Sequence, residues 1–344
     1  MKIDLLPRKN AYKANLHTHS TLSDGNLTPE ELARLYREHG YQVLAITDHE
    51  FIVDHSDLNR EDFLTITSYE LQIVDASIRP RKVDQCCCHL CLLSKDPHTF
   101  SQVYFNPESY DLLRLCKKPE LIPSIKSVGP RPQVKQYSRE IIREVVETAV
   151  NHNMLVAFNH PTWSLESDYE SYRYLDGIYA MEIYNSDCFN TNGLEEYNPA
   201  VYDRMLREGM RVGCIATDDT HAGYPLGDPR CDLFGGWTWI LADRLDYASI
   251  IGALERGDFY ASTGPELFEL TYEDGTVHVR TSDAERITFQ TAGRHAGATI
   301  AKAGESVREA SFVPRGDDRY VRVTVRDHAG HTANTRGYFL ADLC

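Results

Sequence analysis

The chain has 344 residues, of which 42% are hydrophobic and 25% charged, and its formal net charge is −15. This length accommodates one large domain and one small domain around a sizeable buried core. The negative charge argues against a nucleic-acid polymer as partner, because such binders neutralise phosphates with a basic face. No apolar run reaches 18 residues and the N-terminus lacks the apolar stretch of a signal peptide, so we expect no membrane contact.

Nine cysteines, an odd number, favour a reducing compartment, and we expect a cytoplasmic protein. Four of them crowd into the stretch CCCHLC, residues 86–91. Neighbouring residues of a strand point to opposite faces, which makes this stretch a poor disulfide framework. We interpret these cysteines as small apolar side chains that pack a buried strand, with zinc binding or redox chemistry as the alternative.

The first clear element is the stretch LTPEELARLYREHG, which predicts a helix over residues 28–39. Thr28 suits the N-cap, Pro29 the first helical position, and Glu31 completes a capping box. Gly40 then ends the helix, and the apolar stretch YQVLAIT that follows is typical of a buried strand.

Strands and helices alternate up to about residue 262. We predict strands near residues 13–17, 42–47, 62–68, 85–93, 154–159, 177–184 and 211–217, and helices at 28–39, 138–152, 168–175, 195–208 and 246–256. This alternation favours parallel βαβ units. No Gly-rich dinucleotide loop follows the first strand, so a closed or nearly closed barrel fits better than an open doubly wound sheet.

Two segments depart from this rhythm. Residues 95–137 are long, Pro-rich and poor in regular elements, which is typical of a functional loop or lid, although a surface insertion without a role is the alternative. From residue 263 to 344, apolar and polar residues alternate between Gly and Asp turns. That pattern predicts a small all-β, sandwich-like accessory domain after the barrel of residues 1–262.

Histidines and acids gather at the ends of the predicted strands. The C-termini of parallel barrel strands lie on one face, so these residues should converge in space. Buried imidazoles and carboxylates are costly when unpaired, and divalent zinc, manganese or iron would resolve that cost. The candidate metal ligands are His17, His19, Asp24, His49, Glu70, His89, His160, Asp219 and His221.

The motifs LHTHSTLSDG, ITDHE, YE, CHL, NHP and DTH follow one another in this order and resemble those of the PHP (polymerase and histidinol phosphatase) superfamily. The resemblance covers residues 13 to about 262, and the whole chain is similar to two-domain predicted phosphoesterases of the CehA/McbA type. It implies a distorted (βα)7 barrel that binds two or three divalent metals. By resemblance, the first metal takes His17, His19, Glu70 and Asp219, the second takes Glu70, His89 and His160, and the third takes Asp24, His49 and His221.

The weakest of these matches is His89, which falls inside its predicted strand, and His98 is the alternative ligand. Asp48 and Asp218 each precede a candidate ligand. We expect them to take part in catalysis or to orient imidazoles, with a role in capping a strand end as the alternative.

Three further residues are candidates for contact with a substrate. Asn159 lies at the end of the strand predicted at 154–159, and Asn185 at the end of the one predicted at 177–184, which also carries Glu182. Arg230, in GDPRCD, would hold a phosphate oxygen bidentately and assist catalysis, unless it is a solvated loop residue.

These residues predict a metal-dependent phosphoesterase acting on the mono- or diester of a small metabolite, such as a nucleotide or a sugar phosphate. The expected nucleophile is a hydroxide that bridges two metals. The alternatives are a metal-dependent hydrolase of carboxylic esters, amides or lactones, and a non-catalytic binding module stabilised by metal.

Overall fold

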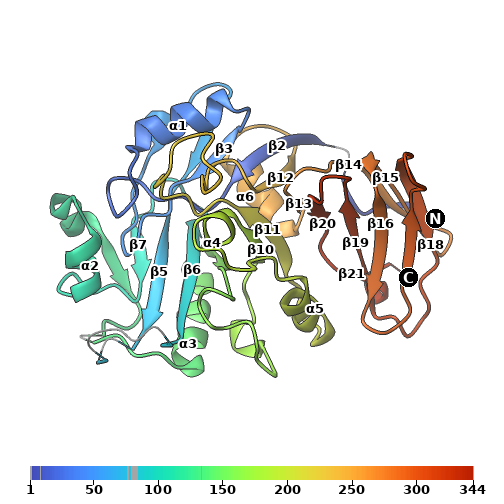
Figure 1. Cartoon of the computed structure of the whole chain (residues 1–344). Helices are drawn as coiled ribbons and strands as arrows, with labels where there is room; N and C mark the ends of the chain where they lie inside the picture. Colours follow the sequence, from blue (N-terminus) through green and yellow to red (C-terminus); the bar gives the residue numbers. More distant parts are fainter. Residues whose placement is uncertain (1, 8, 76, 79–83, 133, 344) are drawn as a thin grey trace.

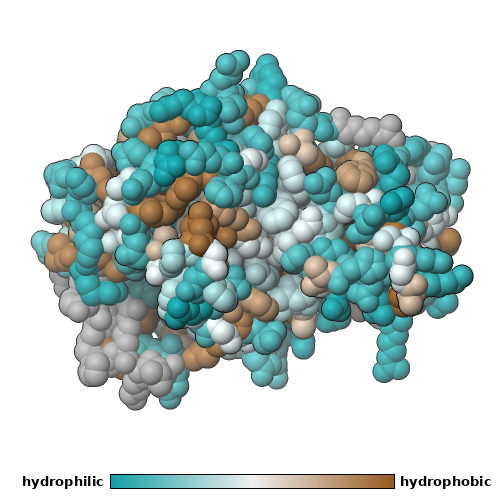
Figure 2. Space-filling view, turned by 45° about the horizontal axis from the view of Figure 1, so that its top comes forward, coloured by the Kyte–Doolittle hydropathy of each residue, from teal (hydrophilic) through white to brown (hydrophobic). Residues whose placement is uncertain are grey.

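The computed structural model describes residues 2–7, 9–75, 77–78, 84–132 and 134–343. A larger α/β part holds most of the first 262 residues, and a smaller all-β part lies beside it (Figure 1). The face shown in Figure 2 is mostly hydrophilic, with hydrophobic residues in small patches. Among the described residues, no helix combines the length and the apolar character that a membrane span needs.

The first helix, α1 (Pro29–Glu38), begins as its capping signals predict. The Thr28 hydroxyl accepts a hydrogen bond from the Glu31 amide at 3.2 Å, and the Glu31 carboxylate accepts one from the Thr28 amide at 2.8 Å. Leu32, Ala33 and Tyr36 form its buried face and pack against residues of the following strand. The capping box therefore sets where α1 starts, and the apolar face sets how it docks.

Two sheets form the α/β part. The first has the order β11-β10-β9-β6-β5, with β5 Ser68–Val74, β6 Cys87–Ser94, β9 Met154–Phe158, β10 Ala180–Asn185 and β11 Gly213–Thr217. The second contains β2 Asn10–Asn15, β3 Val43–Ala45, β4 Leu64–Ile66, β12 Trp237–Ala242 and β13 Phe259–Ser262, in the order β13-β12-β2-β3-β4.

Three details correct the prediction of uniform parallel βαβ units. The strand expected near residues 62–68 is two strands, because β4 ends at Ile66 and β5 begins at Ser68 in the other sheet. β5 then pairs antiparallel with β6, and β6 pairs antiparallel with β9. β12 is also antiparallel to β2. The period-2 apolar pattern marks a strand but carries no information about its direction.

Backbone hydrogen bonds join the ends of the two sheets at one rim. The His19 amide donates to the Thr220 carbonyl at 2.9 Å, and the Glu50 amide donates to the Glu70 carbonyl at 2.8 Å. Below this rim both sheets contribute inward side chains to one core, which includes Ala45, Cys91 and Ile215 and which helix α6 (Tyr247–Arg256) also enters. The sheets therefore enclose a shared interior, although they do not form one continuous ladder.

Helices α3 (Arg139–Asn151) and α5 (Pro199–Arg207) cover the outer face of the five-stranded sheet, as predicted for residues 138–152 and 195–208. The helix predicted at 168–175 is wrong, since only the 3-10 turn Arg173–Leu175 forms there. Its aromatic residues, including Tyr172 and Tyr174, are buried against the same outer core, so tertiary packing overrides local helix propensity.

The thiols of β6 match the packing interpretation. Cys87, Cys88 and Cys91 are buried thiols outside any disulfide, and Cys88 and Cys91 belong to the apolar cores. Burial raises the pKa of the Cys91 thiol to about 12, which makes it an unreactive apolar side chain.

Residues 95–137 contain short elements, which are β7 (Ser101–Val103), α2 (Tyr110–Leu115), the 3-10 turn Pro119–Ser124 and β8 (Lys126–Val128). β7 and β8 pair parallel as a two-stranded sheet. Val103, Leu112 and Ile125 join the outer core of the five-stranded sheet, so this insertion packs on the α/β part. The short helix α4 (Ser186–Asn190) follows β10 and lies close to the rim (Figure 1).

The C-terminal part is a sandwich with its own core. One layer has the order β1-β14-β15-β18, and the other continues the second sheet through β13 to β20, β19, β16 and β17, with β21 beside β19. The strands are β14 Leu267–Glu273, β15 Thr276–Ala284, β16 Arg286–Thr291, β17 Gly297–Ile300, β18 Val307–Phe312, β19 Tyr320–Arg326, β20 Thr332–Asn334 and β21 Tyr338–Phe339.

The boundary expected at residue 263 marks a change in the sequence pattern, but the structure is continuous across it. β13 pairs with both β12 and β20, so one sheet crosses the boundary. The N-terminal strand β1 (Lys2–Asp4) pairs with β14, and Leu5 and Leu6 enter the sandwich core. The sequence assigned those N-terminal residues to the barrel, but they join the sandwich core, which also contains Leu241 of β12 and Tyr260 of β13.

A buried ion pair also links the two parts. Arg322 of β19 is 1% exposed, and its Nε and Nη2 donate to the two carboxylate oxygens of Asp203 on α5 at 2.6 and 2.9 Å. We expect Asp203→Ala to lower the free energy of unfolding by about 3 kcal/mol, because it leaves the guanidinium buried without its partner. Arg34→Ala, which breaks the exposed pair with Glu38, should cost less than about 0.5 kcal/mol. Urea denaturation followed by fluorescence measures both, and equal midpoints would contradict the expectation.

Candidate metal centre

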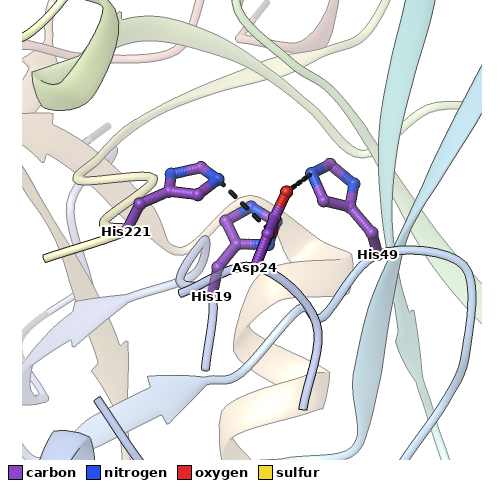
Figure 3. Close-up of side chains that lie close together, drawn as sticks. All are labelled: His19, Asp24, His49 and His221. Carbon is purple, nitrogen blue, oxygen red and sulfur yellow. Dashed lines mark ion pairs between the residues drawn. The ribbon is translucent and has the colours of Figure 1, made fainter. Parts of the chain in front are cut away.

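The nine predicted ligands meet at the rim where the two sheets join. Their ligand atoms form overlapping groups, each with all its atoms within 4.8 Å of one another. One such group is drawn in Figure 3, where the side chains of His19, Asp24, His49 and His221 converge from the loops that follow β2, β3 and β11. Other groups include His17 with His19 and Glu70, and His49 with Glu70 and His89, while His17 and His160 also group with Glu182.

The direction of β6 explains the position of His89. β2, β3, β9 and β11 end shortly before their ligands, and β5 carries Glu70 as its third residue, whereas β6 runs antiparallel to its neighbours β5 and β9. His89 therefore lies near the start of β6, and its Nδ1 is 2.7 Å from Oε1 of Glu70. The alternative ligand, His98, is wrong, because its side chain is 76% exposed and lies near Asp54, outside the cluster.

Glu70 occupies the centre of the cluster and is fully buried. Five imidazoles have a nitrogen within 3.4 Å of its carboxylate oxygens, which are those of His17, His19, His49, His89 and His160. Burial alone would raise the pKa of Glu70, but the imidazoles, above all those of His89 and His49, hold it well below its usual range. Glu70 is thus an anion in a dry site, which is the state that a metal ligand requires.

Asp219 supplies the second central carboxylate. Its Oδ1 lies 3.0 Å from Nε2 of His17 and 2.9 Å from Nε2 of His19. Its backbone is in the left-handed region, with φ 52°, directly after β11. This turn aims the carboxylate back over the rim, where two imidazole nitrogens face one oxygen atom.

Three buried ligand atoms in the cluster have no hydrogen-bond partner, namely Nδ1 of His19, Nδ1 of His49 and Oε2 of Glu70. The last two are 2.8 Å apart, yet their geometry is not that of a hydrogen bond. Buried polar atoms are rarely left unpaired, because each costs about 1–3 kcal/mol. Divalent cations would satisfy these atoms, and nitrogen and carboxylate donors are the ligands such cations take. The residues present therefore fit a metal centre.

The sequence placed Glu182 at a strand end but gave it no role, and the structure supplies one. Its fully buried carboxylate lies 3.0 Å from Nδ1 of His17 and accepts a hydrogen bond from the His160 amide at 2.8 Å. A carboxylate on one ring nitrogen fixes the tautomer so that the other nitrogen faces the metal. Alternation along β10, ending at the rim, is the sequence signal that could have assigned this role to Glu182.

Asn159 and Asn185 do not face a substrate, in contrast to the prediction. Asn159 Nδ2 donates to Glu182 at 3.2 Å, and its Oδ1 accepts from the Cys91 amide at 2.7 Å. Asn185 Nδ2 donates to Glu182 at 3.0 Å and to Asp219 at 3.1 Å. Both amides are fully buried and hold carboxylates in place.

Asp48 and Asp218 have structural environments and not the catalytic ones predicted. Asp48 accepts hydrogen bonds from the amides and hydroxyls of Ser20 and Ser23, and so anchors the loop that carries Asp24. Asp218 accepts from the Tyr36 hydroxyl at 2.7 Å and from the amides of residues 234 and 236. Burial raises the pKa of Asp218 to about 7. These carboxylates fix loops around the cluster, so the capping alternative is the better description.

Arg230 lies away from the cluster, contrary to the substrate role expected of it. Its side chain is 56% exposed, pairs with Asp228 at 3.0 Å and stacks on Tyr224. The basic residue that lines the pocket over the cluster is Arg114 of α2. Sequence reasoning missed it because its segment shows no strand rhythm and no motif.

The cluster opens into a pocket of about 360 Å³. Its floor holds predicted ligands, and its walls come from α2, from the region of α4 and from Trp163. The indole of Trp163 is 38% exposed and packs edge-on against His89 and His160, at 5.1 and 5.2 Å between ring centroids. A larger groove of about 640 Å³ lies elsewhere and contains none of the cluster residues, so the smaller pocket is the candidate active site.

No protein-family model and no curated protein matches the sequence. Among solved structures, the chain is similar to a two-domain protein from Bacteroides vulgatus that contains a predicted PHP-like metal-dependent phosphoesterase. The identity is 14%, the TM-score 0.47, and the match covers 97% of this chain and 98% of that one.

Two further solved structures match a smaller share of this chain, with lower TM-scores. A putative metal-dependent phosphoesterase from Bifidobacterium adolescentis shows 15% identity and a TM-score of 0.40, over 64% of this chain and 93% of that one. An amidohydrolase from Chromobacterium violaceum with bound sulfate and no metal shows 16% identity and a TM-score of 0.36, over 63% and 93%. With such distant matches, the function rests on the residues of the site.

The metal-free protein should lose stability as the pH rises. Burial alone would lower the pKa of His49 and His160, but Glu70 and Asp219 raise each pKa to about 9. The unfolded value is about 6.5, so the stabilisation is fully present below pH 6.5 and is lost as the pH rises through 9. With metal bound the imidazoles are neutral ligands, so this loss should disappear. Thermal denaturation from pH 6 to 9.5, with chelator or with Mn²⁺, measures the difference, and parallel curves would contradict it.

Proposed function

We propose that this protein is a metal-dependent phosphoesterase that hydrolyses the phosphate ester of a small metabolite. The observation that carries the proposal is the buried Glu70 carboxylate surrounded by five imidazoles, with three unpartnered ligand atoms, at the floor of an open pocket. A scaffold protein has no need of such a cluster at the floor of an open pocket, whereas a hydrolase does.

Our assignment of the ligands to two or three ions is the one that the motif resemblance implies. The first ion would take His17, His19, Glu70 and Asp219, the second Glu70, His89 and His160, and the third Asp24, His49 and His221. Support for the second comes from Oε1 of Glu70, which lies 2.7 Å from His89 and 3.3 Å from His160. Imidazole and carboxylate donors suit zinc, manganese or iron.

When bound, divalent ions at this rim would lower the pKa of water and stabilise charge on phosphoryl oxygens. The side chains of the chain supply the rest. Glu182 and the two asparagines orient the ligands, while Trp163 and Leu115 exclude water from the pocket walls. Arg114 offers a guanidinium to an anionic group of the substrate.

Phosphate esters are favoured over carboxylic esters by the charge around the pocket. Two or more cations close together can hold both the attacking and the leaving oxygen of an in-line displacement at phosphorus. Arg114 makes no ion pair with any residue in the described part of the chain, although Asp187, Asp219 and Glu70 line the same pocket. A free guanidinium there suits an anionic substrate.

We further propose that the two sheets are a distorted (βα)7 barrel of the PHP type, in which β6 runs in reverse. The core shared by both sheets and the rim hydrogen bonds between them support this. A cytoplasmic location is proposed on the cysteines, since the eight described ones are all free.

Turnover of phosphate esters tests the proposed function. Purified protein with Mn²⁺ is assayed on p-nitrophenyl phosphate, its bis ester, and panels of nucleotides and sugar phosphates. His19→Ala should reduce kcat/KM by at least ~100-fold, because the loss of a mere outer partner of a ligand already costs 10–100-fold. His328→Ala, at an exposed histidine of the C-terminal part, is the matched control. No phosphate turnover above His19→Ala, with turnover of carboxylic esters or lactones, would move the assignment to the alternative hydrolase.

Arg114 should govern substrate affinity. We expect Arg114→Ala to raise KM about 10- to 100-fold on an anionic substrate, with less effect on kcat, because a charge-assisted hydrogen bond contributes about 1.5–3 kcal/mol. Arg230→Ala should leave both constants near wild type, since that side chain lies outside the pocket. Steady-state kinetics on the best substrate of the panel distinguishes the two arginines. The reverse pattern would restore Arg230 as the substrate residue.

A further inference from the structure

A buried ion pair connects the insertion of residues 95–137 to the rim of the site. Lys135 lies near the end of the insertion, and Glu50 directly follows the predicted ligand His49. Each is 4% exposed, and Nζ of Lys135 lies 2.6 Å from Oε1 of Glu50. Burying two charges costs more than an exposed pair does, so a pair kept at this position calls for a local reason.

The edge of the five-stranded sheet supplies that reason. β5 is the edge strand, and the backbone of residues 48–50 pairs with Glu70 on its open side, through bonds of 3.2 and 2.8 Å. Two residues further along, side chains take over this pairing. The Gln72 amide donates to Oε1 of Glu50 at 3.1 Å, and the Gln72 carbonyl accepts from Nζ of Lys135 at 2.7 Å. The ion pair therefore extends the ladder and fixes the backbone of Gln72.

The side chain of Gln72 reaches a predicted metal ligand. Gln72 and His89 are direct cross-strand partners, and the side-chain Nε2 of Gln72 lies 2.7 Å from Nε2 of His89. Nδ1 of the same ring faces Glu70 at 2.7 Å. The Gln72 amide nitrogen donates to Nε2 when that nitrogen is unprotonated; with the amide turned so that its oxygen faces the ring, it accepts a hydrogen bond from Nε2–H, which leaves Nδ1 to serve as a ligand. Gln72 thus sets the orientation of the His89 ring.

A second side chain of the insertion holds the same rim segment. Gln102 of β7 is fully buried; its Nε2 donates to the Glu50 carbonyl at 2.5 Å and its Oε1 accepts from the Ile52 amide at 2.9 Å. The insertion consequently fixes Glu50 through both its backbone and its carboxylate, and Glu50 cannot move without the insertion.

We propose that Lys135 is a positioning residue for the metal centre, acting through Glu50 and Gln72 to hold His89 ready for an ion. The insertion then sets the affinity of the ion held by His89 and His160. This inference rests on the metal binding in the proposed function but not on the reaction catalysed, so its test measures metal and not turnover.

Two variants separate positioning from mere stability. Lys135→Met with Glu50→Met replaces the ion pair by apolar side chains, which keeps the site packed but removes both contacts to the Gln72 backbone. Gln72→Leu leaves the ion pair in place and removes only the amide that faces His89. Lys126→Met, at an exposed position of the same insertion, is the matched control.

Zinc retention by the full-length protein is measured against a graded series of chelator concentrations, with zinc per chain read by mass spectrometry. Both variants should lose one zinc ion at a chelator concentration 10- to 100-fold lower than wild type and the control, because outer partners of a ligand contribute that much to affinity. Melting temperatures of the metal-free proteins show whether each variant is folded.

Wild-type zinc retention by a folded Gln72→Leu variant would overturn the inference, and so would retention by a folded double variant. A protein that retains zinc in the expected pattern but hydrolyses no phosphate would sink the proposed function and leave the positioning role standing.

Discussion

The structure is organised around one buried charge, the carboxylate of Glu70. It is fully excluded from water and lies against five imidazoles that come from β2, β3, β6 and β9 or the loops after them. An isolated carboxylate in this position would be too costly to keep ionised. The two sheets must therefore bring the imidazoles to within contact of Glu70, and the hydrogen bonds that join the sheets at the rim lie next to these same residues.

A surrounding layer of buried polar groups makes this concentration of charge possible. Glu182 and the two asparagines hold His17, His160 and Asp219. Asp48 and Asp218 act one step further out, on the loops that carry Asp24 and residues 234–236. Some of the carboxylates that give the chain its large negative charge are therefore buried, where they fix the geometry of the site.

The insertion of residues 95–137 belongs to the site more closely than its sequence suggests. Its Arg114 and Leu115 line the pocket. Its Gln102 and Lys135 donate hydrogen bonds to the backbone carbonyls of Glu50 and Gln72 at the rim. These contacts favour a functional loop over a surface insertion without a role. An insertion without a role would not bury two polar side chains against the segment that follows a ligand.

The sequence by itself determined which nine residues form the cluster and that most of them follow the ends of strands. Histidines and acids at strand ends, and capping signals such as that of Thr28, are local features that follow from the chemistry of neighbouring residues. The tertiary structure alone decided the direction of β6 and the split between β4 and β5, because apolar alternation is the same in either strand direction. It also decided between Arg114 and Arg230, and it gave Asp48, Asn159 and Asn185 their supporting roles. Such roles depend on partners far away in the chain, and a local sequence pattern does not predict which distant side chain will form a given hydrogen bond.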